Sequence, residues 1–417
     1  MSADARAPLP ADGAVVVVGA GLGGLRCAET LRAIGFRGAL TLLGAEPGLP
    51  YDRPPLTKQL LSGQWDEARI ALVARDKLGE LAIELRPGVP AASLDAAGRA
   101  VRLADGTSVR ADAVVVATGA HARWLPGTEG LAGVHVVRTL AQGVALRDEF
   151  ARLAGDGRVV VVGGGFIGAE VASTAAVAGL GVIILDTLDV PLSPVVGTMV
   201  GGWLTELHRD AGIEVRTGAS ITSIEAATPA SGPAVVLEDG DRLDADVVVL
   251  GVGVEPSTAW LADSGLTIDD GVVTDAALFA ADGVVAVGDL ARFAWRHAAG
   301  EDQVRIEHWE VTAQLASAAA HSLVAGRDAA PAVSLVPYFW SDQHGRKIQM
   351  LGRPEGTDEA TLLAGGPSEA KFTVAYHREG RLRGVLGLSS PRNVMLCRGL
   401  VERAAPLSEA VELFATT

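Results

Sequence analysis

Residues 159–170 read VVVVGGGFIGAE, four valines followed by a glycine-rich turn and a carboxylate at Glu170. The β-branched residues favour a buried strand, and the glycines favour a tight turn into a helix. The first glycine permits the turn, the second admits a pyrophosphate close to the backbone, and the third lets the helix pack on the strand. The pattern predicts a dinucleotide site at Gly163, Gly165 and Gly168. We expect Glu170 in the first helical turn, where the helix dipole favours a negative charge.

The same pattern occurs near the start of the chain. Residues 15–24 read VVVVGAGLGG, with glycines at the corresponding positions Gly19, Gly21 and Gly24. One such fingerprint is a weak signal, but two in one chain predict two dinucleotides. The simplest interpretation is a flavin that exchanges electrons with a nicotinamide.

An acidic residue at the end of the second strand of such a module binds the ribose hydroxyls of the nucleotide. In the second module the strand 182–185 is followed by Asp186, which would accept hydrogen bonds from the ribose and repel a 2′-phosphate. No arginine in 187–190 would neutralise that phosphate, so we expect NADH to be preferred over NADPH. In the first module the corresponding residue is Gly44, and the nearest acid, Glu46, is the candidate. The alternatives are a solvated loop acid for Glu46 and a strand cap for Asp186.

Length and composition restrict the class of protein. A chain of this length predicts about two to four domains. The 417 residues include 51 glycines and are 49% hydrophobic, which suits buried parallel strands joined by tight turns. The formal net charge of −15 argues against a nucleic-acid partner, because neutralising phosphates requires clustered lysine and arginine.

Other features of the sequence predict a cytoplasmic protein without a membrane partner or a metal site. No apolar run reaches the ~18 to 20 residues of a membrane helix, and residues 1–13 lack the architecture of a signal peptide. Cys27 and Cys397 form no CxxC motif, which excludes a redox-active dithiol of the adjacent type, and we expect each to be a buried filler. The eight histidines show no metal-ligand spacing.

Five further segments belong to a set of motifs that occur in a fixed order. They are LPYDRPPLTK at 49–58, ATG at 117–119, GVVAVGD at 283–289, EHW at 307–309 and FWSDQ at 339–343. With the two glycine motifs they resemble the oxygenase-coupled, NADH-dependent ferredoxin reductases, relatives of putidaredoxin reductase and rubredoxin reductases and, more distantly, of apoptosis-inducing factor. The resemblance covers nearly the whole chain.

The resemblance implies which residues hold each cofactor. Asp289 would bond the ribityl hydroxyls and the phosphate of FAD, and Trp309 would approach the pyrimidine edge of the flavin with its backbone. The full FAD set comprises Gly19, Gly21, Gly24, Glu46, Arg53, Lys58, Thr118, Gly119, Gly288, Asp289 and Trp309. The NAD set comprises Gly163, Gly165, Gly168, Glu170 and Asp186.

The resemblance also implies three catalytic residues. Lys58 and Glu170 would form an ion pair beside the flavin N5, where we expect it to position the nicotinamide and to stabilise reduced flavin. A partly buried ion pair adds little net stability, so its retention at a cofactor needs another reason. Trp340 would lie by the isoalloxazine near the route to the electron acceptor. The alternative for Trp340 is a plain core aromatic.

The expected fold class is α/β. We predict two Rossmann-like dinucleotide-binding domains in a glutathione-reductase-like architecture, followed by a C-terminal α+β domain with a small antiparallel sheet. The predicted segments are 1–122 and 250–328 for the FAD-binding domain, 123–249 for the NAD-binding domain and 329–417 for the C-terminal domain. Helices are expected at 25–34, 203–212, 307–326 and 408–414.

The function that the resemblance implies is transfer of electrons from NADH, with FAD as cofactor, to a small iron–sulfur ferredoxin that serves a cytochrome P450 or another oxygenase. We expect a monomer or a weak dimer. The alternatives are an NADH oxidase or a rubredoxin reductase of the same fold, and an NADH-sensing flavoprotein that acts through partner binding. Because many ferredoxins are acidic like this chain, docking would need a local cationic face. The candidate clusters are Arg292, Arg296 and Arg305, and Arg346 with Lys347.

Overall fold

The computed structural model describes residues 8–153, 155–228, 231–297, 300–369 and 371–415. The chain divides into two compact units that each gather distant segments. The first unit contains the described residues of Met1–Asp52, Ala71–His121 and Pro256–Pro337, and the second contains those of Arg53–Ile70, Ala122–Glu255 and Tyr338–Thr417. The chain therefore leaves and re-enters each unit. The assignment of segments to FAD and NAD domains stays a prediction.

The first unit is built on a six-stranded sheet with the order β19-β20-β7-β1-β2-β3. β1 pairs in parallel with β2 and β7, β7 with β20, and β2 with β3, whereas β19 is antiparallel to β20. The valines of β1 are buried because helices and neighbouring strands cover the parallel sheet. The strands are β1 (Ala14–Val18), β2 (Ala39–Leu43), β3 (Glu84–Arg86), β7 (Ala113–Val116), β19 (Phe279–Ala281) and β20 (Val284–Ala286).

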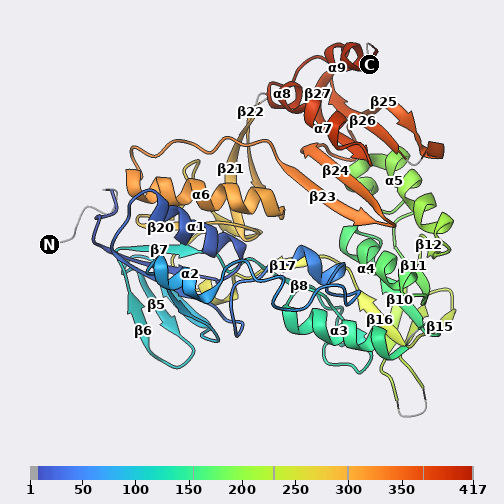
Figure 1. Ribbon diagram of the computed structural model, residues 1–417, viewed down its shortest axis with the longest axis horizontal. Helices are drawn as coiled ribbons and strands as arrows, with labels where there is room; N and C mark the ends of the chain where they lie inside the picture. The colour runs from blue at the N-terminus through green and yellow to red at the C-terminus, as the bar shows by residue number, and fades with distance from the viewer. Residues whose placement is uncertain (1–7, 154, 229–230, 298–299, 370, 416–417) are drawn as a thin grey trace. The chain divides into compact units, whose positions relative to one another are not determined.

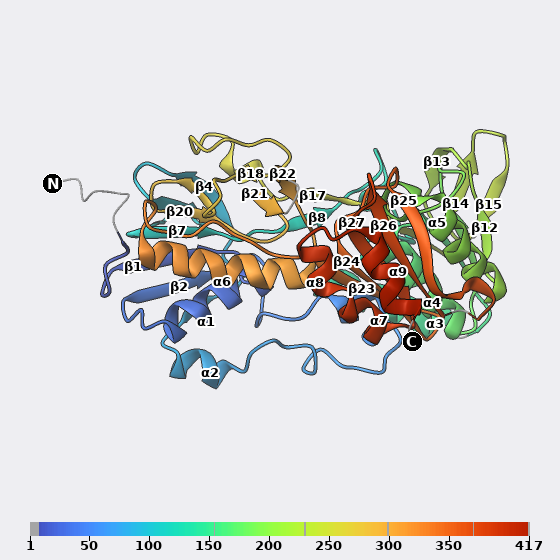
Figure 2. The same cartoon turned by 90° about the horizontal axis from the view of Figure 1, so that it is seen from above.

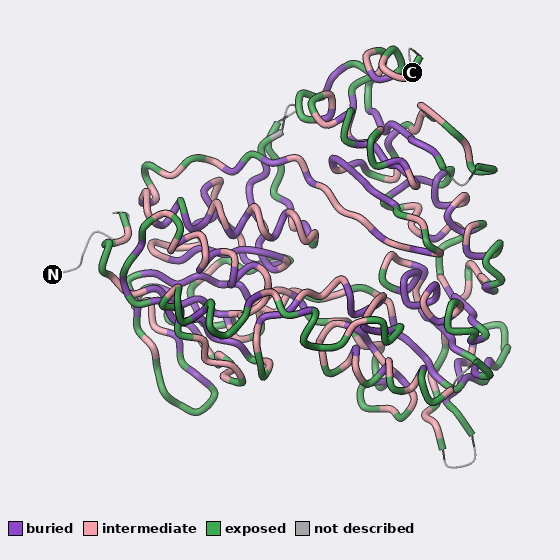
Figure 3. The backbone as a smooth tube through the Cα atoms, in the orientation of Figure 1, coloured by how far each residue is buried: buried purple, intermediate pink, exposed green. Residues whose placement is uncertain are grey.

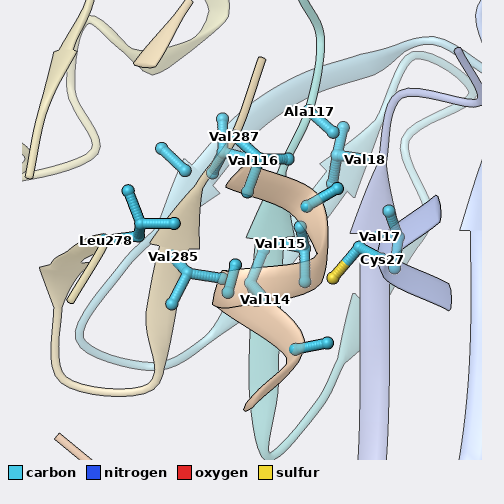
Figure 4. Packing of buried hydrophobic residues seen from close by; sticks show 14 of the residues in the cluster. Val17, Val18, Cys27, Val114, Val115, Val116, Ala117, Leu278, Val285 and Val287 are labelled. Carbon is cyan, nitrogen blue, oxygen red and sulfur yellow. The ribbon is translucent and has the colours of Figure 1, made fainter. Parts of the chain in front are cut away.

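Helices α1 (Leu22–Ala33) and α6 (Trp309–Ala325) lie side by side against this sheet (Figures 1 and 2). Figure 4 shows the core beside them, where Cys27 of α1 lies among the valines of β1 and β7. Cys27 is fully buried, as expected. Two small sheets complete the unit, with α2 (Arg75–Glu80) and the 3-10 turn η2 (Ala259–Leu261). Their strands are β4 (Ala91–Asp95), β5 (Ala100–Leu103) and β6 (Ser108–Arg110), then β18 (Val272–Val273), β21 (Ala291–His297) and β22 (Gly300–Arg305).

The second unit contains a five-stranded parallel sheet with the order β12-β11-β10-β16-β9. Its central strands are buried (Figure 3). The strands are β9 (Val134–His135), β10 (Arg158–Val162), β11 (Gly181–Leu185), β12 (Glu214–Arg216) and β16 (Val247–Leu250). The other elements of this region are α3 (Leu140–Leu153), α4 (Phe166–Val177), the 3-10 turn η1 (Pro54–Thr57) and the antiparallel strands β13 (Ile221–Glu225), β14 (Ala234–Leu237) and β15 (Arg242–Asp244). β8 (Ala120–Ala122) and β17 (Val254–Pro256) lie where the chain passes between the units.

An antiparallel five-stranded sheet ends the second unit, as the alternating sequence predicts. One face of this sheet forms an apolar cluster with residues of α5 (Ser193–Asp210), while α7 (Pro391–Leu396) and α8 (Arg398–Glu402) pack against β24 and β27. Figure 1 shows α5 and α7 on opposite sides of the sheet. The 3-10 turn η3 (Pro367–Glu369) lies between the third and fourth strands, and α9 (Leu407–Ala415) follows α8. The strands are β23 (Tyr338–Gln343), β24 (Arg346–Gly352), β25 (Glu359–Gly366), β26 (Lys371–Arg378) and β27 (Arg381–Leu388).

Two local expectations are wrong. α4 begins at Phe166, so Glu170 is its fifth residue and lies beyond the first turn, where the helix dipole has less influence. α5 begins at Ser193 and not at Trp203. Glycines obscured the early part of α5 in the sequence, and the helix is kinked at Gly197, whose φ is 72°.

Within the described ranges, no helix combines the length and the apolar character needed to cross a membrane.

Candidate functional site

The first glycine turn joins β1 to α1 and forms a cradle that side chains at its glycines would obstruct. Gly19 has φ 115°, and a Cβ added there would lie 2.2 Å from the Ala117 carbonyl oxygen. A Cβ added at Gly24 would lie 1.9 Å from the Gly19 carbonyl oxygen, so only glycine permits this packing of α1 on the turn. A Cβ added at Gly21, the N-cap of α1, would meet nothing within 4 Å. The helix N-terminus can therefore be approached closely by a phosphate, which fits a dinucleotide.

The second glycine turn, between β10 and α4, has the same construction. Gly163 has φ 100°, and a Cβ there would lie 2.5 Å from the Gly251 carbonyl oxygen. A Cβ at Gly168 would lie 2.0 Å from the Gly163 carbonyl oxygen, whereas one at Gly165 would meet only the Gly251 oxygen, at 3.9 Å. Both turns therefore fit the pyrophosphate of a dinucleotide.

In both modules the residue after the first glycine lies beside the residue that follows the second strand. The first module has alanine facing glycine at this contact, and the second has glycine facing aspartate. In the first module a Cβ added at Gly44 would lie 2.9 Å from the Ala20 Cβ, so Ala20 leaves little room for a side chain. In the second module a Cβ added at Gly164 would lie 2.9 Å from Asp186 Oδ2. Glycine at 164 therefore leaves room for the aspartate, whereas alanine at 20 leaves little room for an acid at position 44.

The two candidate ribose acids are held by different groups. Asp186 accepts a hydrogen bond from the Gly164 backbone N–H at 2.8 Å on Oδ2 and from the Leu188 backbone N–H at 2.8 Å on Oδ1. Because a carboxylate can accept about four hydrogen bonds, this carboxylate retains capacity for ribose hydroxyls. Glu46 accepts a hydrogen bond from the Tyr51 hydroxyl at 2.6 Å, a partner that the sequence analysis did not identify.

The remaining FAD candidates of the first unit lie at the ends of strands and at the start of α6. The Thr118 hydroxyl donates to the Ser257 carbonyl at 2.8 Å, and the Gly119 carbonyl accepts from the Ser257 N–H at 2.9 Å. Gly288 has φ 80° and directly precedes Asp289, whose Oδ1 accepts from the Thr312 hydroxyl at 3.3 Å. These contacts fix the backbone at two predicted cofactor segments.

The side chain of Trp309 has a polar anchor. Its indole Nε1 donates to Asp52 Oδ1 at 2.7 Å. Asp52 ends the first stretch of chain in the first unit, so this hydrogen bond ties the start of α6 to the end of that stretch within the same unit. The sequence analysis missed Asp52, although it lies within the quoted motif.

Lys58 and Glu170 form the ion pair that the resemblance implies. Lys58 Nζ donates to Glu170 Oε2 at 2.6 Å, and the two side chains are 12% and 4% exposed. The Thr57 hydroxyl also donates to Oε2, at 2.6 Å, while Oε1 accepts from the Ser341 hydroxyl at 2.7 Å and from the Asp342 N–H at 3.2 Å. Thr57 and Ser341 were not predicted, although each is adjacent to a candidate residue in the sequence.

Arg53 and Trp340, the other candidates of the second unit, have partners of their own. The Arg53 guanidinium donates to the Arg138 carbonyl oxygen. Trp340 lies in β23 with the Lys347 ammonium 5.9 Å from its ring centroid. Lys347 Nζ also lies 3.2 Å from Asp342 Oδ1.

The arginines proposed as a cationic face are paired with acids. Arg292 contacts Asp269, Arg296 contacts Glu301 at 2.7 Å, and Arg305 contacts Asp270 at 3.1 Å and also Glu307. Such pairing reduces the local positive potential that an acidic partner would meet.

A pair of histidines in contact, His208 buried and His344 half-buried, was not predicted. His344, in the turn after β23, places Nε2 2.8 Å from Nδ1 of His208 in α5. Burial lowers the pKa of His208 to about 3, with a smaller contribution from His344, and burial also lowers the pKa of His344. Both imidazoles are therefore neutral near neutral pH. In the parts of the chain that are described, no three histidine, cysteine or acidic side chains come together as metal ligands.

The two cysteines are buried and free of disulfides. Desolvation raises the pKa of the Cys27 thiol to about 12 and that of Cys397 to about 11. Neither is therefore a thiolate at neutral pH, in agreement with the expected filler role.

Comparison with known proteins places this geometry in a family. Residues 13–316 match the model described as pyridine nucleotide-disulphide oxidoreductase, and residues 338–413 match the model described as reductase C-terminal. The chain belongs to the pyridine nucleotide-disulphide oxidoreductase family. Members of this family use FAD and NAD(H). Membership confirms the predicted fold class and the class of NAD(P)H-dependent oxidoreductase.

Curated relatives align over nearly the full length of the chain. Rhodocoxin reductase of Rhodococcus erythropolis is 33% identical over 94% of this chain and 90% of its own. Putidaredoxin reductase of Pseudomonas putida is 34% identical over 90% of this chain and 89% of its own. The ferredoxin–NAD(+) reductase subunit of the benzene 1,2-dioxygenase system of Pseudomonas putida is 35% identical over 93% and 92%.

Solved structures give the same result. Putidaredoxin reductase, in its covalent complex with putidaredoxin, has a TM-score of 0.89 and 31% identity, covering 98% of this chain and all of the other. A ferredoxin reductase from Rhodopseudomonas palustris also has a TM-score of 0.89 and 31% identity, covering 96% of this chain and 97% of its own. The predicted resemblance to oxygenase-coupled ferredoxin reductases is therefore confirmed.

Proposed function

We propose that this protein oxidises NADH and reduces a small iron–sulfur ferredoxin, with FAD as its cofactor, and that the ferredoxin serves a cytochrome P450 or another oxygenase. The observation that carries the proposal is the presence of two glycine cradles, each following a central strand of its own sheet, in a chain of which 90% or more aligns with reductases of this kind. Two cradles in one polypeptide suit an enzyme that exchanges electrons between two dinucleotides.

Under this proposal the first unit holds the FAD. The pyrophosphate would lie at the N-terminus of α1, and Glu46 would bind the ribose. Thr118, Gly119, Gly288 and Asp289 would line the cofactor with backbone and carboxylate groups, and Trp309 would approach with its backbone. When bound, FAD would supply the capacity to accept hydride and to release single electrons, which the side chains of the protein lack.

The second unit would hold NADH at the N-terminus of α4. Asp186 already has one N–H donor on each oxygen, which fixes the carboxylate for the ribose hydroxyls and against a 2′-phosphate. We therefore propose a preference for NADH. Lys58 and Glu170 would act in hydride transfer, because a buried lysine held by a carboxylate is a charge fixed in advance of the reaction. Trp340 would act in electron transfer to the acceptor.

The acceptor distinguishes this function from its alternatives. An NADH oxidase would consume oxygen without a protein partner, and a rubredoxin reductase would pass electrons to a rubredoxin. An NADH-sensing flavoprotein would keep its reduced form for long times and act through a binding partner. The relatives named above are reductase components, which favours the ferredoxin reductase.

The docking face of the ferredoxin belongs to the same proposal. Arg292, Arg296 and Arg305 each contact acids, and Lys347 of the second cluster contacts Asp342, so each cluster has to be tested by charge reversal. Charge reversal at Arg346 should slow ferredoxin reduction at low salt while leaving NADH oxidation by a small dye unchanged. A cytoplasmic location and a monomeric or weakly dimeric state also stay proposals.

The test of the acceptor is cytochrome c reduction by NADH, measured with and without an added ferredoxin, with oxygen uptake followed in parallel. A ferredoxin-dependent rate with little oxygen uptake is expected. Equal rates with and without ferredoxin, accompanied by oxygen consumption, would support the oxidase instead.

A further inference from the structure

The Glu170 carboxylate is saturated with hydrogen bonds. Lys58 Nζ and the Thr57 hydroxyl donate to Oε2, and the Ser341 hydroxyl and the Asp342 N–H donate to Oε1. A carboxylate has about four acceptor sites, so these four donors occupy all of them. Thr57, Glu170 and Ser341 are all buried, and water therefore cannot replace a lost donor without rearrangement. The orientation of this carboxylate is fixed by donors from two separate segments of the chain, 57–58 and 341–342.

The lysine of the pair is less constrained. Lys58 Nζ donates to Glu170 Oε2 at 2.6 Å and to the Pro54 carbonyl at 3.2 Å. An ammonium group has three protons, so these two bonds, counted over the described residues, leave one for a ligand. The direction of that proton depends on where Glu170 holds the nitrogen. A movement of the carboxylate would therefore move the one donor that the pair can present to a bound molecule.

Strand β23 connects this carboxylate to Trp340. Successive side chains of a strand point to opposite faces, so Ser341 and Trp340 face opposite ways. On the Ser341 face, Phe339 packs against Phe166 of α4 with ring centroids 4.8 Å apart. On the Trp340 face, Lys347 lies over the indole ring. One face of β23 is thus fixed to the helix of Glu170, and the other carries the tryptophan.

We infer that Ser341 is a positioning residue, which aligns the Lys58–Glu170 pair by binding Glu170 Oε1 and at the same time anchors the strand that carries Trp340. This inference rests on the proposed function, because it assigns Ser341 a role in the reduction of FAD by NADH. The contact that carries this role is the one from the Ser341 hydroxyl to Glu170 Oε1. Its hydroxyl acts through Glu170, in the way that outer groups orient the ligands of a metal.

The consequence of losing this hydroxyl follows from the geometry. In Ser341→Ala, Oε1 retains only the Asp342 N–H, whose bond of 3.2 Å is the longest of the four. The carboxylate can then rotate, and Lys58 loses its fixed partner. We expect the rate constant for flavin reduction by NADH to fall about tenfold, the effect of removing one buried hydrogen bond to a charged group. The dissociation constant for NADH should change little, because Asp186 and the glycine turn are unaltered.

Ser173→Ala is a matched control. Ser173 is also a buried serine, lies on the same helix α4, and its hydroxyl accepts the His344 N–H at 2.7 Å. It therefore also binds α4 to the end of β23 but does not contact Glu170. A loss of general stability or of helix–strand packing should affect both variants equally, whereas misalignment of the ion pair should appear only in Ser341→Ala.

The test is lysine acetylation of the FAD-loaded full chain, read by mass spectrometry beside stopped-flow reduction. The chain has four lysines, Lys58, Lys77, Lys347 and Lys371, so Lys58 can be followed individually. The side chain of Lys77 is 55% exposed and serves as the internal reference. In Ser341→Ala, labelling of Lys58 relative to Lys77 should rise at least about fivefold, because a released amine is more accessible and more nucleophilic. In Ser173→Ala the ratio should stay at the wild-type value.

Equal Lys58 labelling in wild type and Ser341→Ala, or an equal rise in both variants, would overturn the inference. If Ser341→Ala does not fold, the pair Thr57→Val and Thr57→Ser repeats the test on Oε2, and only the valine variant should expose Lys58. The labelling result is independent of the reaction. If wild type itself were not reduced by NADH, the proposed function would fail while the labelling comparison still decided the role of Ser341.

Discussion

Lys58 Nζ lies 2.6 Å from Glu170 Oε2, although the two residues are 112 positions apart in the sequence. Both side chains are largely buried. Desolvation offsets most of the attraction within such a pair, so the pair is weak evidence for a purely structural role. Its carboxylate is bound by four donors, and its ammonium has one proton left, which is the arrangement expected of a preorganised charge.

The first prediction concerns this lysine. Lys58→Met should reduce the rate constant for flavin reduction by NADH about a hundredfold, since a fixed positive charge is lost from the reaction site. The unfolding free energy should also fall by about 3 kcal/mol, because Glu170 is left as a buried carboxylate without its cation. Stopped-flow absorbance and denaturant unfolding measure the two effects. Lys77→Met, which removes an exposed lysine from its pair with Glu80, should change neither quantity, and an unaltered reduction rate in Lys58→Met would contradict the assignment.

The second prediction separates the two nucleotide modules. Gly24→Ala would place a Cβ 1.9 Å from the Gly19 carbonyl oxygen and should yield colourless protein that does not retain FAD. Gly168→Ala would place a Cβ 2.0 Å from the Gly163 carbonyl oxygen and should yield yellow protein that NADH no longer reduces. Absorbance spectra before and after NADH addition measure both.

The control for these substitutions is Gly202→Ala in α5, where an added Cβ meets nothing within 4 Å. It should keep both the colour and the reduction by NADH. The opposite pattern, with colour lost in Gly168→Ala and kept in Gly24→Ala, would reverse the assignment of the modules.

The third prediction concerns the choice between NADH and NADPH. Asp186→Asn should raise the KM for NADH on the order of tenfold with little change in kcat, because it weakens a charge-assisted bond that ground state and transition state share. The KM for NADPH should fall, because the charge that repels the 2′-phosphate is removed. Steady-state kinetics with a dye acceptor measure both constants. Asp241→Asn, which changes an exposed acid paired with Arg216, is the control and should alter neither KM. If Asp186→Asn lowered kcat and left both KM values unchanged, Asp186 would have a structural role in its loop and not a role in binding the ribose.

The fourth prediction concerns the pH dependence of stability. Burial lowers the pKa of His208 from its ordinary value of 6.5 to about 3, so below pH 6.5 the unfolded imidazole binds a proton that the folded one does not. His208 therefore does not reduce the unfolding free energy above pH 6.5, and reduces it progressively as the pH falls from 6.5 toward 3. The unfolding free energy should drop by about 2 kcal/mol between pH 6.5 and pH 5 from this residue. Urea unfolding at several pH values gives the unfolding free energy as a function of pH. Between pH 6.5 and pH 5 this free energy should fall less in His208→Gln than in wild type, and an equal fall in both proteins would contradict the assignment.

Much of the fold was predictable because it rests on short-range signals. The valine runs 15–18 and 159–162 form buried parallel strands, and the alternating segments after residue 370 form an antiparallel sheet. The N-terminal part of α5 was not predictable, because Pro194 and three glycines interrupt the pattern that marks a helix. The position of Glu170 within α4 was misjudged, since the start of a helix depends on its cap and not on the preceding glycines alone.

The candidate site was predictable only in part. Motifs identified Lys58 and Glu170, but periodicity cannot show that Thr57 and Ser341 bind the same carboxylate, because that depends on how distant segments meet. The same holds for His208 and His344, which lie 136 positions apart. The acids that pair with Arg292, Arg296 and Arg305 were also not evident, since cross-strand and loop partners are set by register. A cluster of arginines in the sequence is therefore not a cationic face until its partners are known.

The most direct test of the central claim is the absorbance spectrum of the FAD-loaded protein under anaerobic conditions, recorded as NADH is added stoichiometrically and compared with NADPH. We predict that one equivalent of NADH bleaches the flavin band within seconds and that NADPH does so far more slowly. A flavin band that persists after excess NADH would contradict the claim that one chain brings two dinucleotides together for electron transfer.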